Sequence, residues 1–236
     1  MAAGQFLARS VTVDGVVRKY QVWVPAAYDR ARKWPAILFL HGAGERGDDG
    51  EKQMTVGLPR ALRDGEVDAQ AIVVFPQCPE GKRWVGAPRK IAIAALNATE
   101  REFSIDRNRV ALTGMSMGGA GAWILAASYP KRWSALVPVC AYVHRPPSLP
   151  DADNPTSESF DEFARRLPQI PIWIFHGSDD PIVPVAESRE MARALGVTAA
   201  YTEFAHMGHN AWDPAYTETH VISWLLDQKR QRKPRE

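Results

Sequence analysis

Continuous apolar runs of four to five residues recur along the chain, at the length of buried β-strands. They cover residues 36–40, 71–75 and 172–175, and a loop containing glycine or proline follows each run. Between the first two runs and the last, residues 89–103 place apolar side chains at the i, i+3, i+4 and i+7 spacing of an amphipathic helix. Strands that alternate with helices predict an α/β fold, with a mostly parallel central sheet and helices on both faces.

The N-terminal region has a different pattern. Residues 6–13 and 16–25 are rich in β-formers and flank Asp14-Gly15, which is the strongest short signal for a hairpin. We therefore expect an antiparallel hairpin before the parallel strands begin. Active sites in such sheets lie beyond the carboxyl ends of the strands, so the polar clusters that follow the apolar runs are the candidates for chemistry.

One apolar run, residues 110–113, leads into Gly114-Met115-Ser116-Met117-Gly118 and then into small residues compatible with a helix. This strand–turn–helix context is that of a nucleophile elbow, in which two glycines allow a tight turn that exposes the serine hydroxyl. The alternative is a glycine-rich turn in which Ser116 only caps the following helix. A short motif of this kind does not decide between the two.

A serine hydroxyl needs an adjacent base, and the base needs an acid to orient it. On this fold the chain order is serine, then acid, then histidine. Asp179 and Asp180 follow the run at 172–175, and His206 and His209 follow the next predicted strand. The order and the positions at strand ends both fit, and two candidates remain open for each role.

Composition gives no support for a nucleic-acid-binding, membrane-spanning or disulfide-rich protein. A net charge of +2 gives no indication of a nucleic-acid partner, and the chain has no apolar run of transmembrane length. Two cysteines do not make a disulfide framework. We expect a single domain over residues 1–236, with a short insertion at 144–170 and a frayed basic tail at 228–236.

Five ordered motifs make the chain resemble the α/β-hydrolase serine esterases, closest to the phospholipase/carboxylesterase-like group often labelled "predicted peptidase". The resemblance extends from about Pro35 to Leu226. The motifs are His41-Gly42-Ala43-Gly44-Glu45-Arg46-Gly47, Pro76-Gln77-Cys78-Pro79 with Trp84, Gly114-Met115-Ser116-Met117-Gly118-Gly119, Trp173-Ile174-Phe175-His176-Gly177 through Val183-Pro184, and Gly208-His209-Asn210 with Trp212.

The resemblance implies a role for each matching position. Ser116 would be the nucleophile, Asp180 the acid and His209 the base, while the backbone N–H groups of Met117 and Ala43 would form the oxyanion hole.

The resemblance leaves other residues near the site to be placed. Asp179 would be a capping carboxylate and His206 a loop residue, and Asp213, which could also orient a histidine, reads better as the start of the terminal helix. Trp84 and Trp212 lie in strand-end loops and are candidates for walls of the substrate pocket.

Two further histidines, His41 and His176, each end a strand in a His-Gly pair. Metal binding is conceivable there, but no cluster with metal-ligand spacing accompanies them, so we expect structural histidines bonded to nearby backbone. We therefore expect neither a metal ion nor a cofactor.

These observations predict a serine carboxylesterase that hydrolyses carboxylic esters with short acyl groups through an acyl-enzyme. The alternatives are a serine peptidase-like hydrolase and a non-catalytic binding module on the same fold. We expect a small-molecule or polymeric ester as substrate, neither nucleic acid nor membrane as partner, and a monomer or homodimer. The location would be cytoplasmic, or extracellular after removal of a leader.

Overall fold

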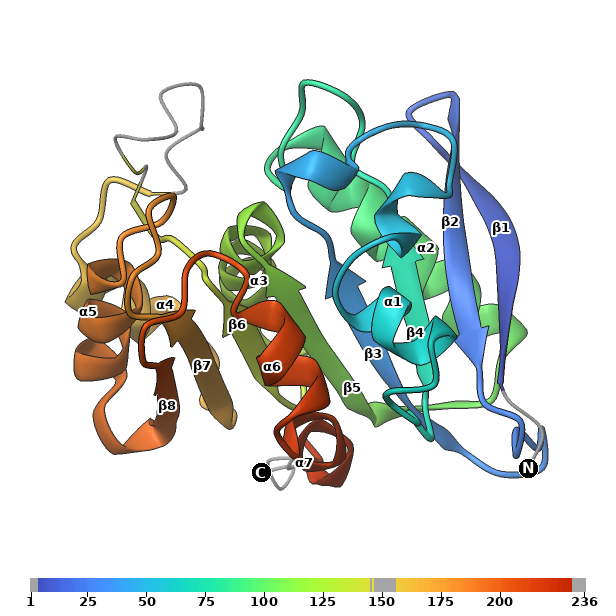
Figure 1. Cartoon of the computed structure of the whole chain (residues 1–236). Coiled ribbons are helices and arrows are strands. Elements are labelled where there is room, and N and C mark those ends of the chain that lie inside the picture. Colours follow the sequence, from blue (N-terminus) through green and yellow to red (C-terminus); the bar gives the residue numbers. More distant parts are fainter. Residues whose placement is uncertain (1–3, 145, 147–155, 231–236) are drawn as a thin grey trace, which may run out of the picture.

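Eight strands form one sheet in the order β1-β2-β4-β3-β5-β6-β7-β8 (Figure 1). The structure is a computed structural model, and it describes residues 4–144, 146 and 156–230. The strands are β1 (Gln5–Val13), β2 (Val16–Val24), β3 (Trp34–Leu40), β4 (Ile72–Pro76), β5 (Ile105–Met115), β6 (Leu136–Val139), β7 (Ile172–Gly177) and β8 (Ala199–Phe204). The pairs from β4 through β8 are parallel, as the apolar runs predict.

The N-terminal hairpin is confirmed. β1 pairs with β2 in antiparallel register from Gln5↔Val24 to Val13↔Val16, and β2 continues antiparallel onto β4. The turn places both central residues at positive φ, 50° at Asp14 and 78° at Gly15. That backbone matches the twist of the flanking strands and explains why this dipeptide makes a tight turn.

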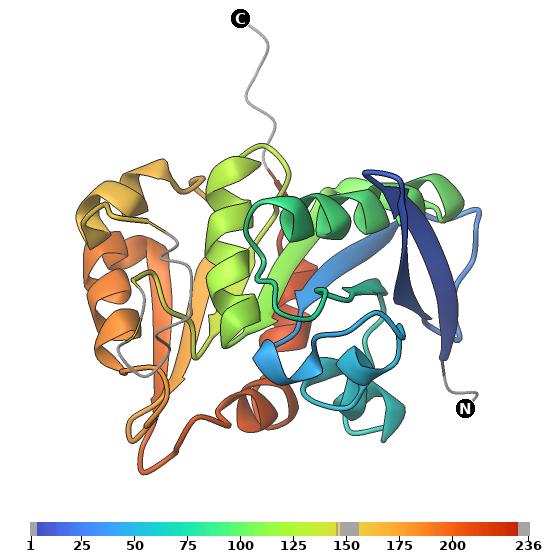
Figure 2. The ribbon, with the colours of Figure 1, turned by 90° about the horizontal axis from the view of Figure 1, so that it is seen from above.

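Helices cover both faces of the sheet (Figure 2). One face carries α2 (Ala87–Glu102), α3 (Met117–Ser128), α4 (Phe160–Arg166) and α5 (Ala186–Leu195). The other face carries α1 (Leu58–Arg63), α6 (Trp212–Thr217) and α7 (Val221–Asp227). The 3₁₀ turns are η1 (Ala43–Glu45), η2 (Lys52–Met54) and η3 (Gly196–Thr198).

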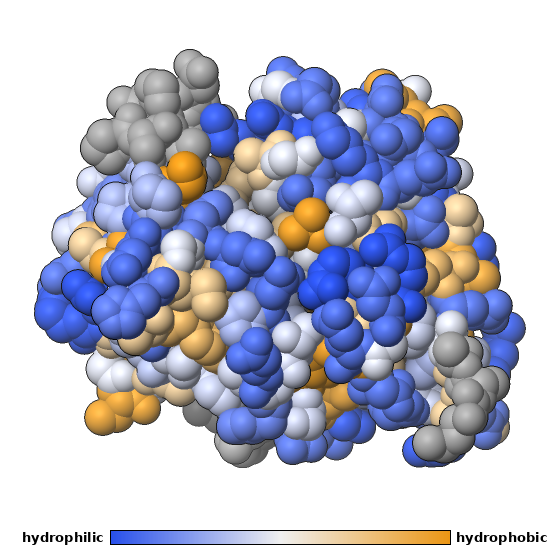
Figure 3. All heavy atoms as spheres, viewed as in Figure 1, coloured by the Kyte–Doolittle hydropathy of each residue, from blue (hydrophilic) through white to orange (hydrophobic). Residues whose placement is uncertain are grey.

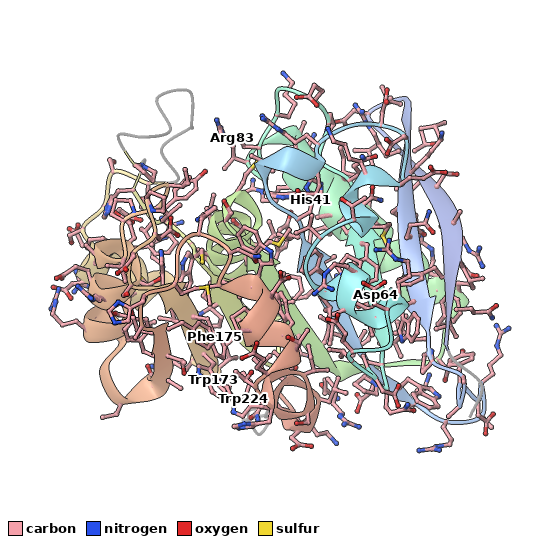
Figure 4. All side chains as sticks on the ribbon, viewed as in Figure 1. His41, Asp64, Arg83, Trp173, Phe175 and Trp224 are labelled. Carbon is pink, nitrogen blue, oxygen red and sulfur yellow. The ribbon has the colours of Figure 1, made fainter. Side chains whose placement is uncertain are left out.

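Each face has its own apolar core because the side chains of a strand alternate between the two sides of the sheet. On the second face an aromatic group joins β7 to α7, where Trp173 stacks on Phe175 at 4.9 Å and meets Trp224 edge-on at 5.4 Å (Figure 4). The two layers hold the strands, and with them the loops at their carboxyl ends, in fixed positions.

The C-terminal region corrects one expectation. The terminal helix is two separate helices, and Asp213 lies in the first of them, α6, rather than at the start of α7. The break coincides with Thr219, whose hydroxyl donates to Ala215 O at 2.6 Å and accepts from the N–H of Val221 at 3.1 Å. A side chain that bonds local backbone competes with the helical ladder.

The predicted tail and insertion are only partly described. In the described part of the tail, Gln228 donates to Trp224 O at 2.9 Å and the Arg230 N–H donates to Asn108 O at 2.7 Å. Residues 231–236, and 145 with 147–155 of the insertion, lie outside the described residues.

No helix in the described part of the chain is long and apolar enough to span a membrane.

Candidate active site

The turn between β5 and α3 has the geometry of a nucleophile elbow. Ser116 has φ 54° and ψ −119°, a backbone conformation that is strained for a residue with a side chain. This strained conformation is maintained because the backbone segments on either side of Ser116 pack closely against each other and against the end of β3. A Cβ built on Gly118 would lie 1.9 Å from Leu40 O, and one on Gly114 would lie 2.3 Å from Gly118 O. Both positions therefore require glycine.

Replacing Gly118 with alanine is expected to destabilise the fold by at least about 2 kcal/mol, because the new methyl group meets rigid backbone rather than a side chain that can move. Urea denaturation measures the change in the free energy of unfolding. Gly44→Ala is the matched control, since a Cβ there meets nothing within 4 Å. Equal stability of the two variants would contradict the packing described for the elbow.

A chain of hydrogen bonds joins Ser116 to His209 and Asp180. The Ser116 Oγ lies 2.9 Å from His209 Nε2, and His209 Nδ1 lies 2.6 Å from Asp180 Oδ2. The acid side chain is fully buried, and the His209 side chain is 19% exposed. Because the carboxylate only accepts, His209 Nδ1 carries the hydrogen and Nε2 is left to accept the serine proton.

The acid is well supplied with donors. Asp180 Oδ1 accepts the backbone N–H of Ile182 at 2.8 Å and that of Val183 at 2.9 Å. Burial by itself would raise the pKa of Asp180, but hydrogen bonds from His176, His209 and Val183 outweigh it and hold the pKa well below its usual value. Asp180 is therefore ionised throughout the neutral range.

The competing candidates lie elsewhere. Asp179 accepts the Ser178 hydroxyl at 2.7 Å, and His206, with a side chain 94% exposed, lies 3.7 Å from Asp179. Asp213 pairs with Arg60 at 3.4 Å. The structure thus brings Asp180 and His209 to the serine, and it leaves these three outside the chain of hydrogen bonds.

Two backbone N–H groups lie at the first positions of the elements beside the serine. Met117 is the first residue of α3 and Ala43 the first of η1, positions whose N–H groups have no partner within their own helix. Both residues line the same cavity as Ser116. Arg46 fixes the η1 loop by donating its Nε–H to Ala43 O at 2.8 Å. The arrangement suits an oxyanion hole.

Beneath this loop lies His41, which is fully buried. Its Nδ1 is 2.7 Å from Gly42 O, and its Nε2 accepts the backbone N–H of Cys78 at 2.9 Å. Burial lowers the pKa of His41 to about 4, so the ring is neutral. This histidine ties the loop after β3 to the loop after β4, as expected of a structural residue.

The prediction for Trp84 is wrong. Its side chain is 1% exposed, and the indole N–H donates to His41 O at 3.0 Å while the ring meets the imidazole edge-on. A Cβ on Gly121 would lie 2.4 Å from Trp84 Cβ, so α3 approaches this tryptophan closely. Trp84 is thus packed under the site and does not line the cavity at Ser116.

The cavity at Ser116 has a volume of about 220 Å³. Trp212 lines this cavity, with its ring edge-on to the His209 ring at 5.2 Å. Glu45, Arg83 and Ile182 also line the cavity, and the sequence gave no indication that they would do so. Figure 4 shows Arg83 near the carboxyl ends of the strands. In the view of Figure 3 apolar residues form small patches on a mostly hydrophilic surface.

One group of three potential metal ligands is present among the described residues. Atoms of Cys140, His176 and Asp180 all lie within 4.8 Å of one another. The side chains of His176 and Asp180 already form hydrogen bonds with Val183 O and His209 Nδ1. Burial raises the pKa of Cys140 to about 12, so its thiol is neutral at neutral pH. Ligation needs a thiolate. The group therefore fits a hydrogen-bonded cluster better than a metal site.

The comparison with protein families decides the affiliation. The family model for the alpha/beta hydrolase fold matches residues 35–169, which include the serine elbow and the His41 loop. The chain belongs to this family. The match confirms the α/β-hydrolase fold expected from the strand pattern and from the five motifs.

Individual relatives are consistent with that affiliation. The chain is 31% identical to a thermostable esterase of known structure, with a TM-score of 0.80 over 95% of this chain and 63% of that one. It is 29% identical to acyl-protein thioesterase 1 of Gibberella zeae over 48% of this chain and 46% of that protein. It is 26% identical to an uncharacterized secreted protein of Arthroderma benhamiae over 84% of this chain and 23% of that protein.

These relatives set the limits of the comparison. The chain spans less than two thirds of the length of each of the three. Two of them are named as an esterase and as an acyl-protein thioesterase. The substrate and the roles of individual residues rest on the geometry of the site.

Proposed function

We propose that the protein is a serine carboxylesterase that cleaves carboxylic esters with short acyl groups through an acyl-enzyme. The observation that carries this proposal is the continuous hydrogen-bonded chain from Ser116 through His209 to an ionised Asp180, at 2.9 Å and 2.6 Å, facing a cavity. The three side chains have the order and the roles that serine hydrolases require.

The first half of the reaction forms the acyl-enzyme. Ser116 Oγ attacks the ester carbonyl carbon while its proton passes to His209 Nε2. The carbonyl oxygen becomes an oxyanion, which accepts hydrogen bonds from the N–H groups of Met117 and Ala43. Asp180 stabilises the imidazolium. Collapse of the tetrahedral intermediate breaks the bond to the alkoxy oxygen, which leaves as the alcohol with the proton from His209.

The second half releases the acid. A water molecule gives its proton to His209 Nε2 and attacks the acyl carbon, which forms a second oxyanion in the same position. This intermediate expels Ser116 Oγ, which recovers the proton from His209. Each half begins and ends with a neutral imidazole and an ionised Asp180, so the enzyme is regenerated.

The cavity limits the size of the acyl group. Its volume of about 220 Å³ lies below the ~300–1,000 Å³ of pockets that enclose a drug-sized ligand. Trp212 and Ile182 supply apolar wall, whereas Glu45 and Arg83 bring charged groups to the same space. A long alkyl chain has too little apolar surface to bury there, so short acyl groups and a solvent-facing alcohol fit best.

We therefore expect kcat/KM for p-nitrophenyl esters to be highest for acyl groups of roughly two to six carbons, by the size of this pocket. The rate is expected to rise smoothly through the solubility limit of each ester, because interfacial activation needs a broad apolar surface around the site. Initial rates below and above that limit measure both features.

The control is the Ser116→Ala variant with the same esters, which corrects for spontaneous hydrolysis. A maximum at twelve or more carbons, or a jump in rate when an emulsion forms, would contradict the proposed substrate class.

A further inference from the structure

A second histidine contacts the acid of the proposed triad. His176 is the next-to-last residue of β7, and its side chain is completely buried. Its Nε2 lies 3.2 Å from Asp180 Oδ2, the same oxygen that His209 Nδ1 approaches at 2.6 Å. Two imidazole rings therefore converge on one carboxylate oxygen, that of His176 from the end of β7 and that of His209 from the loop after β8.

The hydrogen on His176 can be placed from its neighbours. Nε2 is also 3.0 Å from Val183 O, and a carbonyl oxygen only accepts. Nε2 therefore carries a hydrogen, which it shares between Val183 O and the Asp180 carboxylate. On the other side of the ring, Nδ1 lies 2.7 Å from the hydroxyl of Ser188, a buried residue of α5. The ring is thus fixed at both nitrogens.

We propose that His176 is a positioning residue of the active site, which fixes the Asp180 carboxylate and draws part of its negative charge away from His209. In this arrangement the negatively charged Oδ2 accepts from two N–H donors, so each hydrogen bond is weaker than it would be with one donor. The orientation of the acid then depends on β7 and α5, and not only on the turn at residues 177–184. The consequence for catalysis rests on the esterase function proposed above.

Few other titratable groups face this cluster among the described residues. The Cys140 thiol at the end of β6 is neutral, because burial raises its pKa to about 12. Glu203 is the register partner of His176 on β8, and its carboxylate is held by Arg189 at 2.6 and 2.8 Å. His209 and His176 therefore supply the imidazole donors at Asp180 Oδ2, while the backbone N–H groups of Ile182 and Val183 donate to Oδ1.

The test compares His176→Leu, which has no donor, with His176→Gln, whose side-chain amide places an N–H close to the position of Nε2. The leucine variant removes the His176 donor from Oδ2, so the hydrogen bond from His209 Nδ1 to Oδ2 strengthens. We expect the downfield proton resonance of His209 Nδ1–H to move further downfield, and the acidic limb of kcat/KM to shift to higher pH by about 0.5–1 unit.

The same substitution leaves Asp180 freer to rotate. We expect kcat to fall about tenfold in His176→Leu with KM changed less than twofold, the size expected for loss of a hydrogen bond to a charged group. His176→Gln is expected to restore the resonance, the pH profile and most of kcat. His206→Asn, at an exposed histidine outside the chain of hydrogen bonds, is the control and should match the wild type in all three measurements.

A structural role alone would predict a different result, namely a lower melting temperature with an unchanged Nδ1–H resonance and pH profile. That outcome, or a glutamine variant as defective as the leucine variant, would overturn the proposal. If the leucine variant does not fold, Ser188→Ala serves instead, because it releases the ring from α5 and should shift the resonance in the same direction. The resonance is read without substrate, so this result is distinct from failure of the proposed esterase function.

Discussion

Replacing either Ser116 or His209 with alanine is expected to lower kcat/KM for an activated short-chain ester by about 10⁴-fold or more. The reason is that the members of this chain of hydrogen bonds act together. Ser116 becomes a nucleophile only when its proton passes to His209 Nε2, which lies 2.9 Å from the serine Oγ. Residual hydrolysis would come from binding and from the N–H groups of Met117 and Ala43.

The double variant gives the matched control for this expectation. Residues that act as a unit are strongly non-additive, so Ser116→Ala combined with His209→Ala should be no slower than either single variant by more than a few-fold. Circular dichroism establishes that each variant is folded. A folded Ser116→Ala protein that hydrolyses the ester near the wild-type rate would refute the mechanism.

The second large effect is expected at the acid. Asp180→Asn should lower kcat by about 10³-fold or more, because an amide can donate to His209 Nδ1 and so stabilise the tautomer whose Nε2–H faces the serine. The Asp180 side chain is completely buried, so it has no contact with bulk solvent. Steady-state kinetics at the optimum pH measures the loss.

The neighbouring carboxylate provides the matched comparison. Asp179 is exposed and accepts a hydrogen bond from Ser178, so Asp179→Asn should change kcat less than about threefold and stability by less than about 1 kcal/mol. Equal losses of activity in the two variants, or a larger loss at Asp179, would overturn the assignment of the acid.

The fold could be predicted from the sequence where one local pattern admits one structure. Buried parallel strands are short and apolar on both faces, so the run at residues 36–40 is recognisable, and the Asp14-Gly15 pair determines the turn of the hairpin. The division of the terminal helix was not predictable, because it depends on hydrogen bonds that Thr219 makes with local backbone. Nothing in helical periodicity indicates which threonine will make them.

The candidate site shows the same limit. The meeting of Ser116 with Asp180 and His209 follows from strand ends that share one edge of a parallel sheet. The position of Trp84 does not, because whether an aromatic ring lines a cavity or packs beneath it depends on how closely α3 approaches. The contact of His176 with Asp180 was also not predicted from the sequence, although the two residues lie only four positions apart.

The most direct test of the account is labelling with a fluorophosphonate, which reacts only with an activated serine hydroxyl. We predict a single adduct on the intact protein, located at Ser116 by peptide mass spectrometry and lost in Ser116→Ala, His209→Ala and, to a large extent, Asp180→Asn. A protein that stays unlabelled in its folded state, or an adduct on any other residue, would contradict the proposal that Ser116 is the catalytic nucleophile.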